Sequence, residues 1–416
     1  MKTQYRRVVI TGQGAITSLG KSVDECWQAI MDYRLGYKHR SLECAGIKSA
    51  FYGEIEDEPS IRFVPPGIRR RLPRFARLAM FAAKEAIEQA YGDRAIKDCY
   101  DPCRCGVIIG TGWAGQDESI QNHDQYRDTG LGSTFGCIFS MPNVATAACS
   151  QFWGLRGYQN TPIAACATGT IAIGDAFEAI RCGRADMMLA GSGESLRSHT
   201  SIWNIDVLRA LTREQDDITK ACCPFSKDRN GFVLSEGAAV LCLEERESAI
   251  ARGATILGEI TGYGNFSDAT DFTAPAEDKI ARVKTIDYAL RQAGIEASML
   301  DYINAHGTST PLNDKNECEA IKIALGDTAL SIPVSSTKSY SGHLIAAAGS
   351  FETIICLQAM HHHRIPATHH LYNPDPDCDL DFVAQGHRQA DIHHALNLSF
   401  GFGGANAALV ISRGEV

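Results

Sequence analysis

The chain has 416 residues, enough to bury a large core and to divide into two halves. Its hydrophobic content of 44% and charged content of 21% are ordinary for a soluble globular protein. The formal net charge of -9 argues against general nucleic-acid binding, which needs a basic surface.

The N-terminal stretch leads into strand-like sequence within a few residues. Val8, Val9 and Ile10 follow a short charged segment that lacks the long apolar core and the cleavage site of a signal peptide. Apolar runs elsewhere are interrupted by glycine or charged residues well before they reach membrane-spanning length. We therefore expect a cytoplasmic protein without a membrane span.

Residues 163–170, Ile-Ala-Ala-Cys-Ala-Thr-Gly-Thr, form the first segment with clear chemical content. A short apolar stretch ends there in a turn of small residues, and residues 171–180 follow with apolar side chains at helical spacing. Cys166 is thus expected at a helix N-terminus, where unpaired N–H groups and the helix dipole favour the thiolate. The same N–H groups can hold an oxyanion when the sulfur attacks a carbonyl carbon. An isolated cysteine is by default a core residue, but this turn favours a nucleophile.

Two polar turns in the second half carry the other candidate groups. His306 lies in residues 304–310, Asn-Ala-His-Gly-Thr-Ser-Thr. Lys338 and His343 lie in residues 335–343, Ser-Ser-Thr-Lys-Ser-Tyr-Ser-Gly-His. Taken one at a time, the lysine could be a solvated surface residue, and a histidine could belong to a surface turn. Taken together, one thiol, two histidines and a lysine are the parts of a thioester enzyme that also handles a carbanion.

The cysteines and histidines elsewhere do not have the spacing of metal ligands. Of 15 cysteines, Cys103-x-Cys105 and Cys222-Cys223 lack the paired spacing of a zinc site. Eight of the 13 histidines fall between residues 361 and 394, in proline-containing, loop-like sequence without helical i, i+4 spacing. We expect no bound metal, and most cysteines to be small buried hydrophobes.

The last glycine-rich segment, residues 397–406, reads Asn-Leu-Ser-Phe-Gly-Phe-Gly-Gly-Ala-Asn. A dinucleotide-binding interpretation fails, because no helix with the spacing of that motif follows. The glycines instead favour a tightly turned loop that brings Phe400 and a backbone N–H near the sulfur.

The chain repeats its own order of strands and turns. Four segments of the first half match four of the second: 8–14 with 258–264, 107–112 with 302–308, the Cys166 segment with 334–349, and 187–193 with 395–401. Four matches in the same order are hard to explain by chance. The apolar strands and intervening helices predict a duplicated α/β chain with halves 1–253 and 254–416. Polar strand ends of both halves would meet in one site.

These motifs together resemble the elongating β-ketoacyl-acyl-carrier-protein synthases of the thiolase-like superfamily. The resemblance covers nearly the whole chain, and it implies a thiolase-like fold in a duplicated five-layer α-β-α-β-α arrangement. No second catalytic cysteine of the thiolase type follows Phe402. The motifs lie at residues 110–112, 165–170, 224–232, 304–310, 335–343 and 400–404.

The resemblance implies a mechanism built on a Cys-His-His set. Cys166 takes an acyl group from the phosphopantetheine thioester of an acyl carrier protein, with the N–H groups of Cys166 and Phe400 as oxyanion hole. Malonyl-carrier protein then loses CO2 while neutral His306 and His343 hydrogen-bond the enolate oxygen, and the carbanion attacks the acyl group. No cofactor belongs to the enzyme itself, since the carrier protein brings the phosphopantetheine.

The resemblance also assigns supporting groups. It places Lys338 as a positive charge that orders the histidines, with Glu352 as its structural partner. The residues that it implies for substrate binding are Thr308, Thr310, Trp113, Phe400 and Phe402.

Trp113 departs from the family pattern. In residues 110–115, Gly-Thr-Gly-Trp-Ala-Gly, it replaces a small or aliphatic residue that shapes the acyl pocket at the dimer interface of the family. A stiff indole predicts a shorter or flatter pocket. The chain is therefore similar to synthases of aryl polyene or polyketide pathways, which pair with a chain-length-factor subunit. A homodimer, or a heterodimer with such a related subunit, is expected.

Four alternatives remain to be weighed. A housekeeping fatty-acid elongation synthase would have the same motifs. A non-catalytic chain-length-factor-like subunit would keep the fold but lose the nucleophile, and the retention of Cys166 argues against it. A degradative thiolase would need the second cysteine, and a cysteine hydrolase would have no use for two enolate-binding histidines.

Overall fold

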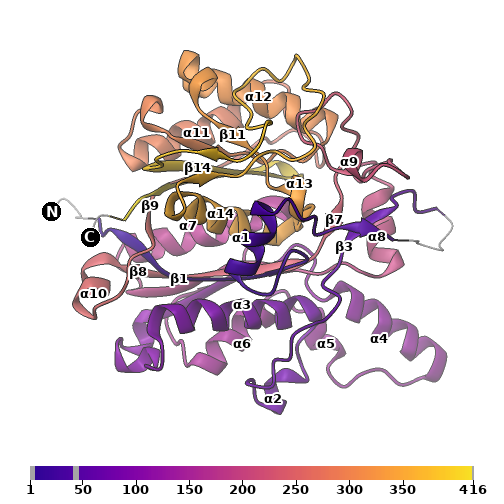
Figure 1. Ribbon diagram of the computed structural model, residues 1–416. Helices are drawn as coiled ribbons and strands as arrows, with labels where there is room; N and C mark the ends of the chain where they lie inside the picture. Colours follow the sequence, from indigo (N-terminus) through magenta and orange to yellow (C-terminus); the bar gives the residue numbers. More distant parts are fainter. Residues whose placement is uncertain (1–4, 41–45, 415–416) are drawn as a thin grey trace.

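The computed structural model describes residues 5–40 and 46–414, which fold into alternating layers of helices and strands (Figure 1). The layer-forming helices are α3 (Arg74–Tyr91), α6 (Val144–Trp153), α7 (Thr168–Arg181), α11 (Ile280–Ala293), α12 (Pro311–Leu325) and α14 (Ala348–His361). Helices α7 and α14 lie between two sheet layers; α3 and α6 cover one outer face, and α11 and α12 cover the other. The expected five-layer arrangement is confirmed.

One ten-stranded sheet supplies both strand layers. Its strands are β1 (Val8–Thr17), β4 (Cys105–Gly110), β5 (Gln159–Asn160), β6 (Met187–Glu194), β8 (Gly237–Glu245), β9 (Gly258–Ser267), β10 (Tyr302–Asn304), β11 (Val334–Ser335), β14 (His394–Gly401) and β15 (Ala405–Ser412). Their order is β11-β10-β14-β15-β9-β1-β8-β6-β4-β5. Residues Val8–Ile10 pair with Gly258–Ile260 and join the two layers.

Each half of the chain contributes the same strand order. Counted outward from the β1–β9 junction, the halves read β1, β8, β6, β4, β5 and β9, β15, β14, β10, β11. The repeated segments predicted from sequence lie on equivalent strands, such as 187–193 on β6 and 395–401 on β14. The duplication is thus visible in the topology. The boundary after residue 253 lies between α10 (Arg246–Ala251) and β9, and remains a prediction.

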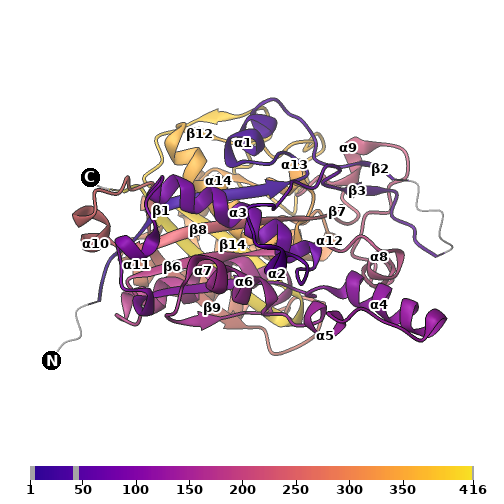
Figure 2. The same ribbon diagram turned by 90° about the horizontal axis from the view of Figure 1, so that it is seen from below.

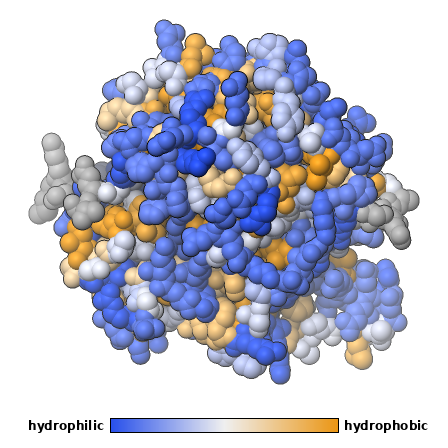
Figure 3. All heavy atoms as spheres, in the orientation of Figure 1, coloured by the Kyte–Doolittle hydropathy of each residue, from blue (hydrophilic) through white to orange (hydrophobic). Residues whose placement is uncertain are grey.

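The remaining elements are short or peripheral. They are α1 (Val23–Met31), β2 (Lys38–His39), β3 (Phe51–Gly53), α2 (Pro66–Arg69), α4 (Gln116–Thr129), α5 (Gly136–Phe139), α8 (His199–Asp206), α9 (Ile218–Ala221), β7 (Leu234–Ser235), α13 (Lys338–Ser341), β12 (Arg364–Ile365) and β13 (Arg388–Gln389). Helices α4 and α5 project from one end of the molecule (Figures 1 and 2). The face in Figure 3 is mostly hydrophilic, because most apolar side chains lie between the layers.

The matching segments 8–14 and 258–264 share the sequence Thr-Gly-x-Gly, at residues 11–14 and 261–264, and this sequence has a packing explanation. A Cβ on Gly12 would lie 2.0 Å from the carbonyl oxygen of Ala86 in α3, which runs along β1 and β8 (Figure 2). A Cβ on the matching Gly262 would lie 2.1 Å from the carbonyl oxygen of Ala289 in α11. Only glycine permits such close contact between strand and helix. The duplicated motif therefore allows an outer helix to pack closely against a strand in each half.

The two central helices cross at their N-termini. A Cβ on Gly169 would lie 2.6 Å from the backbone nitrogen of Ser350, and one on Gly349 would lie 2.1 Å from Oγ1 of Thr170. The small residues after Cys166 and in residues 346–350 thus allow the start of α7 to rest on the start of α14. This crossing places the site-forming turns of both halves side by side.

Candidate active site

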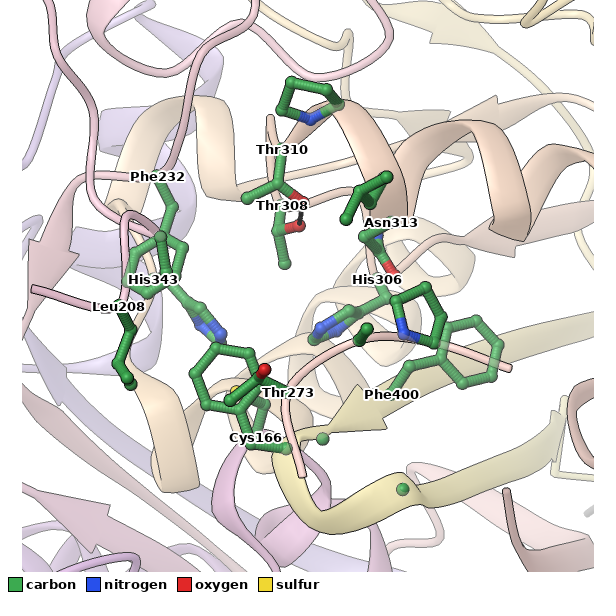
Figure 4. A pocket seen from close by; sticks show the side chains of 18 of the residues that line it. Cys166, Leu208, Phe232, Thr273, His306, Thr308, Thr310, Asn313, His343 and Phe400 are labelled. Atoms are coloured by element: carbon green, nitrogen blue, oxygen red, sulfur yellow. Dashed lines mark hydrogen bonds between the residues drawn. The ribbon is translucent and has the colours of Figure 1, made fainter. Parts of the chain in front are cut away.

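Three chemically active side chains converge in one cavity (Figure 4). Cys166 precedes α7, His306 follows β10, and His343 lies between α13 and α14. The sulfur and one ring nitrogen of each histidine lie within 4.8 Å of one another, and all three residues are buried. The cavity holds about 340 Å³ and is also lined by Thr308 and Thr310. Residues of both halves therefore form this cavity, as the duplication predicted.

The turn before each central helix contains a strained residue. Ala165, next to Cys166, has a φ of 45°, and Ile345 at the equivalent turn of the second half has a φ of 50°. Left-handed backbone is unfavourable for such side chains, most of all for β-branched isoleucine. Both turns lie next to the place where α7 and α14 approach each other closely. They direct Cys166 and His343 into the same cavity.

The buried sulfur is protonated in the unliganded cavity. Burial raises the pKa of the Cys166 thiol to about 12, and the positive charge of Lys338 offsets only part of this effect. The backbone N–H groups at this turn favour the thiolate, as expected, but desolvation of the anion outweighs them. The thiol must lose its proton as it attacks.

The backbone N–H groups that face the sulfur belong to Phe402 and to Cys166 itself. The resemblance implied the N–H of Phe400 here, whereas in the structure it is the N–H of Phe402 that lies near the sulfur. Phe400 is still inside strand β14, paired with Asn406 of β15, whereas Phe402 lies beyond the strand in the glycine-rich turn. The aromatic ring of Phe400 stands edge-on to His306, with 5.9 Å between ring centroids.

Both histidines are neutral and present an N–H to the cavity. The backbone N–H of Ile345 donates to Nδ1 of His343 at 3.2 Å, so the ring proton resides on Nε2, which is buried without a partner. Nζ of Lys338 lies 3.5 Å from Nδ1 of His306, which places the proton of that ring on Nε2 as well. Burial, followed by the charge of Lys338, lowers the pKa of both rings well below 6.5.

This protonation pattern does not fit a metal site. A histidine that binds a metal donates its second ring N–H to an acceptor. Here Nδ1 of His343 accepts a hydrogen bond, and the proton therefore occupies the nitrogen that a metal would need. The donor atoms are also spread over up to 4.8 Å, wider than a tetrahedral zinc site requires. The set fits hydrogen-bond donation to a substrate oxygen better.

Lys338 forms a fully buried ion pair with Glu352 of α14. The two side chains are 1% and 2% exposed, and burial raises the pKa of Glu352 to about 7 while Lys338 lowers it. The pairing expected from sequence is thus present. It keeps the lysine within reach of His306.

We predict that Lys338→Met lowers the free energy of unfolding by about 3 kcal/mol, because Glu352 is left buried without its counter-charge. Denaturant titration of the purified variant measures this change. The double variant Lys338→Met/Glu352→Gln is the control and should recover part of the loss. Equal stability of the single variant and the wild type would contradict a stabilising role for the pair.

Sequence reasoning missed several residues that build the site. Glu317 of α12 accepts the backbone N–H groups of His306 and Gly307 at 2.6 and 2.8 Å, which fixes the histidine turn. The ring of Phe232 packs edge-on against His343, 4.8 Å away. Arg282 of α11 also lines the cavity. Phe232 ends the 224–232 motif, but that motif does not show that its ring meets His343. No local pattern signals Glu317 or Arg282, which approach the site from distant segments.

The other predicted residues are divided between the cavity and its surroundings. Phe400 and Phe402 line the cavity, and the hydroxyls of Thr308 and Thr310 are hydrogen-bonded to each other at 2.9 Å (Figure 4). Trp113 does not line it; its half-buried indole packs against the apolar cluster that contains Cys166. A hydrogen bond stabilises the turn that contains Trp113: the N–H of Gly112 donates to the buried carboxylate of Glu194 at 2.7 Å.

Comparison with known proteins identifies the relatives of this chain. Residues 5–249 match the model of the β-ketoacyl synthase N-terminal domain, and residues 257–372 match that of the C-terminal domain. A 3-oxoacyl-[acyl-carrier-protein] synthase 2 of Synechocystis sp. is 39% identical over 413 residues, or 99% of each chain.

Solved structures give the same result. One chain of a type II polyketide acyl-carrier protein in complex with its hexaketide-bound ketosynthase is 34% identical, with a TM-score of 0.91 over 99% of this chain and 100% of that one. One chain of a ketosynthase in complex with its chain-length factor from Xenorhabdus doucetiae is 25% identical, with a TM-score of 0.83 over 98% of each. Within the described residues, no helix has the length and apolarity needed to cross a membrane.

Proposed function

Because the chain belongs to the β-ketoacyl synthase family, we propose that Cys166, His306 and His343 carry out a decarboxylative condensation of malonyl-carrier protein with an acyl group. The observation that supports this most is the geometry of the cavity. A thiol lies within 4.8 Å of two neutral imidazoles whose N–H groups face it. Such a set serves both acyl transfer and enolate formation.

In the first half-reaction, Cys166 attacks the thioester of an acyl-carrier protein. As the S–C bond forms, the bond between the acyl carbon and the pantetheine sulfur breaks, and the proton lost by Cys166 ends on that departing sulfur. The N–H groups of Phe402 and Cys166 stabilise the oxyanion of the tetrahedral intermediate. The charge of Lys338 lowers the energy of the thiolate that develops.

In the second half-reaction, malonyl-carrier protein enters the same cavity. The bond between its α-carbon and carboxylate breaks, CO2 leaves, and the electron pair forms an enolate on the thioester oxygen. The Nε2–H groups of His306 and His343 donate to that oxygen. The carbanion then attacks the acyl-Cys166 carbonyl and releases a β-ketoacyl-carrier protein with the thiolate of Cys166.

The carrier protein is the partner that this cavity requires. Thr308 and Thr310 lie along the cavity wall outside the reacting groups, where they can hydrogen-bond the amides of a pantetheine arm. The phosphopantetheine belongs to the carrier protein, so the enzyme needs no cofactor of its own.

An elongation assay tests this function. Purified protein, malonyl-carrier protein and a panel of saturated and conjugated acyl-carrier proteins are incubated, and products are read by mass spectrometry. Acyl-dependent CO2 release and a β-ketoacyl product are expected. Absence of product with every primer, with and without a related partner subunit, would overturn the proposal.

We infer further that the natural acyl chain belongs to a specialised polyene or polyketide pathway. Trp113 supports this, since its indole packs against the apolar cluster that contains Cys166. The subunit would act as a homodimer or with a chain-length-factor partner. Housekeeping fatty-acid elongation is the alternative; the Synechocystis relative is named a 3-oxoacyl-[acyl-carrier-protein] synthase 2. Efficient extension of long saturated primers in the assay above would favour that alternative.

We predict that Trp113→Gly broadens the range of accepted acyl lengths, because loss of the indole opens space next to the apolar cluster around Cys166. Product profiles with a graded series of acyl primers measure the change. Trp153→Gly, which changes a tryptophan at the end of α6, is the control. An unchanged profile for Trp113→Gly would argue that Trp113 does not limit the acyl chain.

A further inference from the structure

One buried cation of the cavity has no hydrogen-bond partner among the residues that the structure describes. Arg282, in the first turn of α11, is 5% exposed and lines the same cavity as Cys166 and His306. Its Nε and Nη1 atoms are buried and have no hydrogen-bond partner. A buried guanidinium without partners is unfavourable, which indicates that a ligand completes the site.

The acidic residues near Arg282 are already engaged elsewhere. Asp268 accepts hydrogen bonds from the side chain of Asn406 at 2.8 Å and from the N–H of Ala276 at 3.3 Å. Glu317 accepts the N–H groups of the His306 turn. No carboxylate among the described residues comes within 4.0 Å of the guanidinium, so these residues contribute only a general negative field.

Other buried arginines of this chain are paired. Arg74 forms ion pairs with Glu58 and Glu236, and Arg252 is paired with Glu244. The fold thus satisfies its structural guanidinium groups with carboxylates. Arg282 differs, and it is the one of these three that lines the cavity.

The position of Arg282 is set by the wall of the cavity. Its guanidinium lies over the ring of Phe400, 4.2 Å from the centroid, a cation–π geometry that fixes the group without satisfying its N–H donors. Burial lowers the pKa of Arg282 to about 10, so it remains a cation at neutral pH. Its charge contributes to the low pKa of His306, which places it close to that ring.

We propose that Arg282 binds the carboxylate of the malonyl group before CO2 is lost, a role that rests on the proposed function. In this reaction the acyl chain and CO2 are uncharged, and the phosphate lies at the far end of the pantetheine arm. The malonyl carboxylate is therefore the anion that reaches the region of His306. A guanidinium fork matches a carboxylate with two N–H donors.

This contact orients the breaking bond. The thioester oxygen is hydrogen-bonded to His306 and His343, and Arg282 holds the carboxylate away from that oxygen. The C–C bond that breaks can therefore align with the carbonyl π system. When that bond breaks, its electrons stay on the α-carbon, and neutral CO2 loses its attraction to Arg282. Binding is thus stronger to the ground state than to the product, and its loss should mainly raise KM.

The test compares Arg282→Met with Arg291→Met, an exposed arginine at the other end of α11. The removed charge-assisted contact should raise KM for malonyl-carrier protein about 10-fold to 100-fold, with little loss of kcat. Acylation of Cys166 by acyl-carrier protein, followed by intact mass, should be unchanged in both variants. Arg282→Lys, which keeps the charge, should have an intermediate KM.

Two results would overturn the role of Arg282. One is an unchanged KM in Arg282→Met; the other is equal loss in acylation and in malonyl use, which would mark a purely structural residue. Failure of the wild type to consume malonyl-carrier protein would instead refute the proposed function itself. If Arg282→Met does not fold, the KM of Arg282→Lys decides, and a wild-type value refutes the role.

Discussion

Replacement of Cys166 by alanine is expected to abolish acyl-enzyme formation and to reduce condensation by at least about 10³-fold. Cys166 is the one cysteine that lines the cavity among the described residues, and a thiolate is the strongest nucleophile available there. Decarboxylation of malonyl-carrier protein should persist at a measurable rate, because both imidazole N–H donors remain. Intact mass after incubation with acyl-carrier protein measures the first effect, and CO2 release measures the second.

Cys149→Ala is the matched control for this experiment. Cys149 is also buried, but it lies in α6 and does not line the cavity. The Cys149→Ala protein should be acylated on Cys166 at the wild-type rate. An acylated Cys166→Ala protein would refute the assignment of the nucleophile.

Replacement of His343 by alanine is expected to lower the rate of condensation by about 10²–10³-fold, the usual loss when one donor to a developing oxyanion is removed. Nε2 of His343 is buried without a partner, so its N–H is available to the enolate oxygen. Acylation of Cys166 should continue. Rapid-quench measurement of the two half-reactions separates these effects.

His370→Ala provides the control for the histidine experiment. His370 is buried as well, but it is not part of the cavity wall. Its replacement should leave both half-reactions intact. If His343→Ala lost acylation to the same degree as condensation, a structural role in the turn before α14 would explain the result better than enolate binding.

The sequence was sufficient to predict the duplicated fold and the convergence of Cys166, His306 and His343. These predictions depend on local patterns: apolar strands, turns of small residues and the order in which they recur. Gly12 and Gly262 illustrate this point, because each meets the same local requirement for contact with a helix. Because the same local patterns recur in the same order in both halves, the repeated strand order could be predicted from sequence.

The electrostatic state of the site could not be predicted in this way. The helix N-terminus before α7 suggested a thiolate, but burial by residues from both halves raises the pKa of Cys166 to about 12. The amide that faces the sulfur is that of Phe402, since the end of strand β14 is set by its pairing with β15. Both outcomes depend on neighbours that are distant in sequence.

Sequence alone thus predicted the three side chains that the structure brings together, Cys166, His306 and His343, and the strand order that recurs in the sheet. The tertiary structure alone decided the protonation of the thiol, the support of His306 by Glu317 and the position of Arg282 over Phe400. The physical reason is that the two kinds of interaction act over different distances along the chain. Secondary structure and turns follow from short-range backbone preferences, whereas desolvation and charge interactions depend on the full set of groups that folding brings together.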